Sequence, residues 1–196
     1  MTTTFDPQTA RHLYPPAESL IRERAERHHQ LGLENPEQFA PFDAFAADLA
    51  RGAVELTAIH TEPYAMLNLV GQDQHFLGLY EPGTGPNSPA TTGRFAFGRR
   101  MSRNAGFCPH VIDRRGKALV LEDVRAFPRF KGNPVVDRYR IRTYVGAPLV
   151  DPSDGLIIGT VCLVGPEPRP WGDDGLAYIK DKAHQAMNLI LDNART

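Results

Sequence analysis

The chain has 196 residues, of which 41% are hydrophobic, and its formal net charge is −1. This length allows one hydrophobic core with an extension, and the balanced charge gives no overall field that would favour nucleic acid or an anionic membrane. Two cysteines are too few to staple a domain of this size, which favours a reduced, cytoplasmic setting. The N-terminus "MTTTFDPQ" does not predict a secretory signal, and the longest uncharged apolar run, residues 155–166, is shorter than the roughly 18 residues of a membrane span.

The first part of the chain, residues 1–37, is predicted to be a partly helical N-terminal extension. "LYPP" interrupts the chain, and residues 17–32 then predict a charged helix with few apolar positions. Such a helix cannot form a core by itself, so we expect it to dock on the domain or on a partner chain. Pro36 favours a new helix start, and we place the main domain at residues 38–196.

The N-terminal half of this domain begins with a helix. Apolar residues at helical spacing predict it over residues 38–58. "YAMLNLV" and "HFLGLYE" predict two strands joined by a tight turn. Residues 81–93 have no periodicity and predict a long loop, "NAGFCPHVID" predicts a short helix or turn, and "KALVLED" predicts a third strand.

The C-terminal half is predicted to contain two long strands and a closing helix. Residues 124–140 mix helix formers with breakers, which indicates an irregular crossover; residues 142–170 supply strands four and five around the turn "DPSDG". Asp173 or Asp174 is expected to cap the last helix. This order predicts an α+β fold with helices on one face of a mainly antiparallel sheet and long irregular segments over the other.

Several stretches, taken in order, resemble one known family. "PYAMLNLVGQDQHFLG", "FCPHVI", "ALVLEDVRAFPRFKGNPVV", "IRTYVGAPLVDPSDGLIIGTVCLVGPEPRPW" and the closing helix resemble a GAF domain over about residues 38–193. The resemblance implies a central antiparallel sheet, the helices of both chain ends on one face, and a loop-roofed pocket on the other. It also implies a sensory or regulatory signalling module that binds a small molecule or a partner protein. A further alternative is that the module fills this pocket with its own side chains and only holds a partner.

Gly146 and Gly159 lie in the middle of the two long apolar runs, where glycine weakens a strand. We therefore expect another group to come close to the backbone at both positions. The resemblance offers two candidates, a helix on the far side of the sheet or a pocket occupant, and helix packing is the interpretation we favour.

The ligand-binding candidates are polar or aromatic residues of the predicted roof and of the strands beneath it. They are Phe97, Cys108, His110, Asp123, Phe130, Arg142 and Tyr144. We expect no catalytic or metal-binding residue among them. The expected partners are a second copy of the chain, bound through residues 36–56 and 174–193, and a signalling protein. The basic clusters "RRMSR" and "DRRGK" lack a nucleic-acid-binding motif, so neither nucleic acid nor a membrane is expected as a partner.

Other GAF functions require features that the sequence lacks. A covalent bilin uses a cysteine, commonly followed by histidine, beside an Asp-x-Pro motif, but here Cys108 precedes Pro109 and that motif is absent. The cyclic-nucleotide signature is also absent, and the arginines of residues 129–142 are interpreted as a solvated surface. His110 alone could ligate haem iron, yet a single histidine is more often structural, and no nearby group completes a zinc site. The cofactor, if the protein has one, is unknown.

The enzymatic alternative is a free methionine-(R)-sulfoxide reductase, which needs a nucleophilic thiolate and a resolving cysteine. The resemblance places one of that family's cysteines near residues 129–136, where this chain has none. Cys162 lies within an apolar strand and is interpreted as a buried hydrophobic residue, which leaves Cys108 as the one exposed thiol. One thiol without a resolver argues against this activity.

Overall fold

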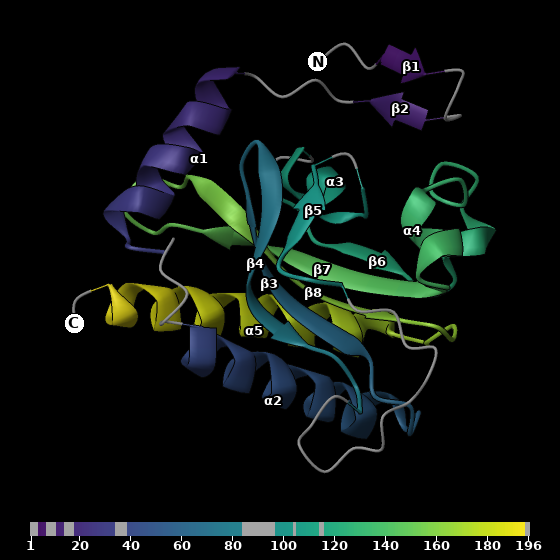
Figure 1. Cartoon of the computed structure of the whole chain (residues 1–196). Helices are drawn as coiled ribbons and strands as arrows, with labels where there is room; N and C mark the ends of the chain where they lie inside the picture. The colour runs from purple at the N-terminus through teal and green to yellow at the C-terminus, as the bar shows by residue number, and fades with distance from the viewer. Residues whose placement is uncertain are drawn as a thin grey trace.

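The computed structural model describes residues 4–6, 11–13, 18–33, 39–83, 97–103, 105–113 and 116–194. Its centre is a six-stranded sheet in the order β5-β4-β3-β8-β7-β6, in which every neighbouring pair is antiparallel (Figure 1). The strands are β3 (Tyr64–Val70), β4 (Asp73–Tyr80), β5 (Arg100–Ser102), β6 (Leu119–Leu121), β7 (Thr143–Val150) and β8 (Ile157–Gly165). The predicted α+β class with an antiparallel sheet is confirmed.

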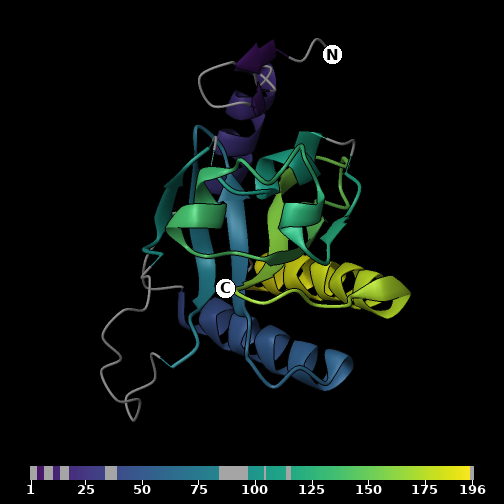
Figure 2. The ribbon, with the colours of Figure 1, turned by 90° about the vertical axis from the view of Figure 1, so that its right-hand side faces the viewer.

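Helices cover both faces of this sheet, but of different kinds. The long helices α2 (Phe39–Thr57) and α5 (Gly172–Asn193) lie on one face, which we call the helix face (Figure 2). The other face is covered by short elements, namely α3 (Cys108–Asp113), η2 (Val124–Ala126) and α4 (Pro134–Arg138). We call these elements the roof, and the side that they cover the roof face.

The alternation of β8 shows how the sequence divides its side chains between the faces. Successive residues of a strand point to opposite sides of the sheet. Val161 and Leu163 accordingly join the core under α2 and α5, whereas Cys162 and Val164 join a second core beneath the roof. Both cores are buried, so β8 is apolar on both faces except at Thr160.

The helix face needs a glycine, but not at the predicted positions. A Cβ atom at Gly78 in β4 would lie 2.5 Å from the carbonyl oxygen of Phe42, so α2 packs directly on this bare backbone. At Gly159 the crowding atom is instead the carbonyl oxygen of Asn68 in the neighbouring strand, and at Gly146 it is the hydroxyl of Tyr144. The favoured interpretation of helix packing is therefore wrong for both residues.

Helix α1 (Glu18–Gln30) docks on the domain at the start of β8 through polar contacts. Arg24 Nε donates to the carbonyl oxygen of Ile157 over 2.8 Å, and His28 Nε2 lies 2.8 Å from that of Ile158. Arg27 adds ion pairs with Asp151 and Asp154 of the turn between β7 and β8. The predicted alternative of docking on the domain is thus the one observed, while the boundary at residue 38 stays a prediction.

Several short elements differ from the sequence prediction. Strand β5 was not expected, nor were β1 (Thr4–Asp6) and β2 (Arg11–Leu13), which pair with each other. The crossover contains η2 and α4, and α5 begins at Gly172 without a side-chain cap, so Asp173 and Asp174 lie in its first turn instead. Most of the predicted loop at 81–93 falls outside the described residues. Within the described ranges, no helix is both long enough and apolar enough to cross a bilayer.

Candidate functional site

Where the structure describes the roof face, the protein's own side chains leave only a narrow hollow beneath it. The hollow between sheet and roof measures about 20 Å³, room for about one water molecule. Small-molecule pockets are typically roughly 300–1,000 Å³. Side chains of the sheet, of α3 and of the segment before α3 line this hollow, among them Met66, Phe107, Cys108, Tyr144 and Cys162. The interior thus matches the alternative in which the module fills its own pocket.

The two cysteines meet in the lining of this hollow, one from the roof and one from the sheet. Cys108 begins α3 and Cys162 lies in the middle of β8, and their Sγ atoms are 3.6 Å apart. Both are free thiols, 5% and 1% exposed respectively. Cys162 is buried as expected, but two expectations are wrong. Cys108 is not an exposed thiol, and it does have a second cysteine within reach.

Tyr144 brings a hydroxyl group to the same sulfur. Its Oη donates to Cys108 Sγ over 3.6 Å, and its ring packs against that of Phe107 at a centroid distance of 5.1 Å. Gly146 follows two residues later on the same face of β7, and any Cβ there would collide with the Tyr144 phenol. The glycine at position 146 therefore makes room for a side chain of the protein itself.

Two further polar side chains lie in the apolar sheet beneath the cysteines. Asn68 in β3 and Thr160 in β8 are register partners and are fully buried. The Asn68 amide nitrogen donates to Gln74 Oε1 over 2.7 Å, and Gln74 in turn donates to the carbonyl oxygens of Ser102 and Ala105. Among the described residues, Asn68 Oδ1 and Thr160 Oγ1 have no hydrogen-bond partner. This network ties the segment before α3 to the centre of the sheet.

A pair of hydrogen bonds also fixes the turn that precedes Cys108. Gly106 has φ = +78°, a conformation that favours glycine, two residues before the cysteine. Asn133, the N-cap of α4, accepts from the Gly106 amide over 3.0 Å and donates to its carbonyl oxygen over 2.6 Å. The start of α3 is thereby held against α4 as well as against the sheet.

These surroundings separate the acidities of the two thiols. The hydrogen bond from Cys162 lowers the pKa of Cys108 to about 6, against the opposing effect of burial, and the hydrogen bond from Tyr144 acts in the same direction. The same hydrogen bond, together with burial, raises the pKa of Cys162. Cys108 is therefore the thiol that ionises first, and Cys162 retains its proton.

The predicted ligand-binding residues are only partly brought together. Phe97, Cys108 and Tyr144 line the hollow. Phe130 and His110 do not line it, and their ring centroids are 5.1 Å apart. Asp123 and Arg142 form a bidentate ion pair, with oxygen–nitrogen distances of 3.0 and 2.6 Å, and are absent from the lining.

The sequence analysis missed Cys162, Asn68, Thr160 and Gln74 as members of this site. One signal was available, because period-two alternation in "GTVCLVG" puts Thr160 and Cys162 on one face. An asparagine within the apolar strand "YAMLNLV" was a second signal, since buried polar side chains need partners. Nothing local showed that Cys108, 54 positions away from Cys162, would lie over that face.

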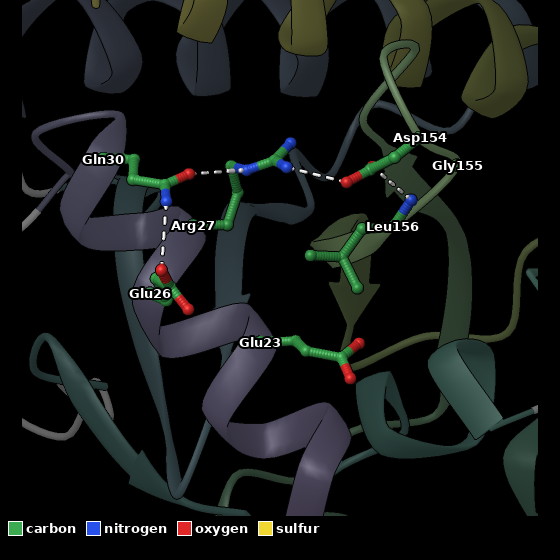
Figure 3. A pocket seen from close by; sticks show the side chains of 7 residues that line it. All are labelled: Glu23, Glu26, Arg27, Gln30, Asp154, Gly155 and Leu156. Atoms are coloured by element: carbon green, nitrogen blue, oxygen red, sulfur yellow. Dashed lines mark hydrogen bonds and ion pairs between the residues drawn. The ribbon is translucent and has the colours of Figure 1, made fainter.

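A second hollow, of about 540 Å³, is an open groove between α1 and the turn before β8 (Figure 3). Its rim carries Glu23, Glu26 and Asp154, and Arg27 extends across it toward Asp154. Asp151 and Asp154 already neutralise Arg27, which is the cationic side chain among the lining residues. The groove therefore has an acidic rim that does not favour an anionic ligand. In the part of the chain that the structure describes, no group of three or more His, Cys, Asp or Glu is placed to hold a metal ion.

The sequence matches the model of the GAF domain family over residues 41–190. The chain belongs to the GAF family. No curated protein matches the sequence significantly. Membership agrees with the order of strands and helices described above and with the resemblance noted in the sequence.

Solved structures confirm the GAF fold at low sequence identity. A putative GAF sensor protein from Burkholderia vietnamiensis is 19% identical, with a TM-score of 0.51 over 92% of this chain and 100% of that one. The GAF domain of an Acinetobacter phosphoenolpyruvate-protein phosphotransferase is 11% identical, with a TM-score of 0.53 over 90% and 94%. A type II free methionine-R-sulfoxide reductase from Thermoplasma acidophilum is 10% identical, with a TM-score of 0.50 over 76% and 94%. The GAF fold thus occurs in sensors, regulators and enzymes.

Proposed function

We propose that this GAF domain is a regulatory signalling module that acts through contacts with other protein chains rather than through a bulky ligand in a preformed pocket. The observation that carries the proposal is the narrow hollow under the roof, which measures about 20 Å³ among the described residues and is too small for an effector. Family membership supports a sensory or regulatory role, because the fold is found in such proteins.

The partner we propose first is a second copy of the chain, bound through α2 and α5. These helices lie side by side on the face opposite the roof, and their outer surfaces face away from the sheet (Figure 2). Phe45 and Leu56 remain partly exposed on α2, among charged residues such as Asp48 and Arg51. A mixed surface of this kind suits a regulated interface, since transient interfaces are more polar than permanent ones. The site of the signalling partner would be the same pair of helices.

Native mass spectrometry and light scattering of the freshly purified, reduced protein test this proposal. We expect a dimer at micromolar concentration and no co-purifying small molecule. Replacing Leu56 by Glu should shift the protein to the monomer, whereas Glu55→Gln, a neighbouring exposed change, should leave the dimer intact. A pure monomer would remove the dimer, and a stoichiometric bound effector would remove the role of the closed roof.

The second candidate function is a thiol-dependent reduction of free methionine-(R)-sulfoxide. The observation in its favour is the pair of sulfurs at 3.6 Å, which supplies the resolving cysteine that the sequence analysis did not find. The size of the hollow argues against it, because an amino-acid substrate would require the roof to open. With a thioredoxin reducing system and this substrate, the reductase would consume reductant, and Cys108→Ser would abolish turnover. Absence of turnover in the wild-type protein would exclude this candidate.

A further inference from the structure

We propose that Cys108 and Cys162 form a redox-active dithiol site, which a small hydroperoxide such as hydrogen peroxide converts into an intramolecular disulfide. The sulfurs lie 3.6 Å apart within one chain and beside the same hollow. The proposal goes beyond the regulatory function and does not depend on the dimer. It identifies a site of covalent modification and the chemical class of its reactant.

The bond needs only a small movement. A disulfide is about 2.0 Å long, so the two sulfurs must approach by roughly 1.5 Å. Cys162 is held in place, because β8 pairs with β3 on one side and with β7 on the other, opposite Met66 and Gly146. Cys108 stands at the first position of α3, a helix of six residues. We infer that the start of α3 moves down toward the sheet when the bond forms.

The environment assigns the roles of the two thiols. The thiolate is the form that attacks a peroxide. Hydrogen-bond donors converge on Cys108 from the Cys162 thiol and the Tyr144 hydroxyl, while Asn68 and Thr160 provide an amide and a hydroxyl from the sheet below. Among the described residues the Thr160 hydroxyl has no hydrogen-bond partner, which leaves it available to donate to a charged sulfur. Cys108 is therefore the attacking thiol and Cys162 the resolving one.

The hollow limits the size of the reactant. It is lined by both cysteines and measures about 20 Å³, enough for a molecule near the size of water. Hydrogen peroxide has two heavy atoms and is close to this limit. A hydroperoxide with a bulky organic group would have to displace Phe107 or Met66, both of which are buried in the wall of the hollow.

The reaction balances with the peroxide as the oxidant. The Cys108 thiolate attacks one peroxide oxygen, so that an S–O bond forms, the O–O bond breaks, and the leaving hydroxide takes up a proton to become water. The Cys162 sulfur then attacks the sulfenic acid, forming the S–S bond and breaking the S–O bond, and its proton leaves with the second water. Two thiols lose two electrons in total, and one hydrogen peroxide becomes two molecules of water. A cellular dithiol can reduce the disulfide by exchange.

The test uses the reduced wild-type protein, freed of reductant and treated with hydrogen peroxide. We expect each chain to lose both free thiols and the mass of two hydrogen atoms. Mass spectrometry should show the peptides containing Cys108 and Cys162 joined by a disulfide, while the denatured protein keeps the mass of a single chain. Retention of both thiols by the folded protein, under conditions that oxidise the guanidinium-unfolded protein, would overturn the proposal. Disulfides between chains in place of the internal one would overturn it as well. Light scattering of the reduced protein reports on the dimer separately.

Two single variants test the assigned roles. When the Cys162→Ser variant is treated with hydrogen peroxide, oxidation should stop at a sulfenic acid on Cys108, which dimedone can trap. In the Cys108→Ser variant the Cys162 thiol should remain unoxidised. Oxidation of Cys162 in Cys108→Ser at the wild-type rate would contradict the assignment.

Cumene hydroperoxide should react more slowly than hydrogen peroxide with the wild-type protein, and equal rates would contradict the role of the small hollow. Circular dichroism checks the fold of each variant, and the wild-type measurement decides the proposal if a variant does not fold.

Discussion

The two faces of the sheet are both buried, but they are built for different purposes. The helix face packs aliphatic side chains such as Val161 and Leu163 against two long helices. The roof face packs aromatic side chains around a polar centre that contains two thiols, an amide and a hydroxyl. A buried polar group costs stability unless it is hydrogen-bonded, and the Thr160 hydroxyl has no partner among the described residues. Stability and chemistry are thus divided between alternate residues of the same strands.

The largest difference in stability between the two faces is expected when neighbouring residues of β8 are replaced. Leu163→Ala, on the helix face, should lower the free energy of unfolding by about 2–5 kcal/mol, because it leaves a cavity in a closely packed core. Cys162→Ala, one residue away on the roof face, removes a single sulfur atom and should lower it by much less. Urea denaturation followed by circular dichroism measures both. Equal losses would show that the two faces contribute to stability in the same way.

A smaller effect is expected where α2 packs on the sheet. Gly78→Ala places a Cβ atom 2.5 Å from the carbonyl oxygen of Phe42, so the helix must shift, and we expect a loss of about 1–3 kcal/mol. Gly71→Ala is the matched control, because its Cβ atom would enter open space within the described structure. The difference between the two midpoints of urea denaturation measures the effect. If Gly78→Ala is no less stable than the control, α2 does not rest on the bare backbone.

The third prediction concerns the pKa of the Cys108 thiol on the roof face, and its expected effect on stability is small. The pKa of Cys108 is lowered to about 6, so its thiolate should form as the pH rises through that region, well below the ordinary value for a thiol. Cys162→Ala removes the largest stabilising hydrogen bond, and burial should then raise the pKa. Tyr144→Phe removes a weaker hydrogen bond and should produce a smaller upward shift. The ultraviolet absorbance of the thiolate, titrated in each protein, gives the midpoints. If the titration midpoint of Cys108 is the same in Cys162→Ala as in the wild-type protein, the two sulfurs are not coupled.

The sequence predicted the helix face better than the roof face, for a physical reason. Helical spacing in residues 39–57 and the apolar runs of β3, β7 and β8 are local patterns, and they were sufficient to predict the antiparallel sheet and its long helices. The roof depends on contacts between distant residues. Asn133 clasps Gly106, and Gln74 reaches Ala105, and neither pairing has a local signal.

The glycines show the same limit. A glycine within a strand correctly indicated a close approach, but periodicity alone could not identify the group that approaches. At position 146 that group is Tyr144, a side chain of the same strand, and at position 159 it is the backbone of β3. The position that α2 requires, Gly78, lies in the shorter pattern "HFLGLYE", where its meaning depends on which helix crosses it.

A crystal structure of the reduced protein tests the central claim, that the roof face is a closed core organised around a pair of touching thiols. The account predicts Sγ atoms of Cys108 and Cys162 close to 3.6 Å apart, with the Tyr144 hydroxyl directed at Cys108 and at most a water molecule between sheet and roof. Sulfur atoms separated by an open cavity that holds a small-molecule effector would contradict it.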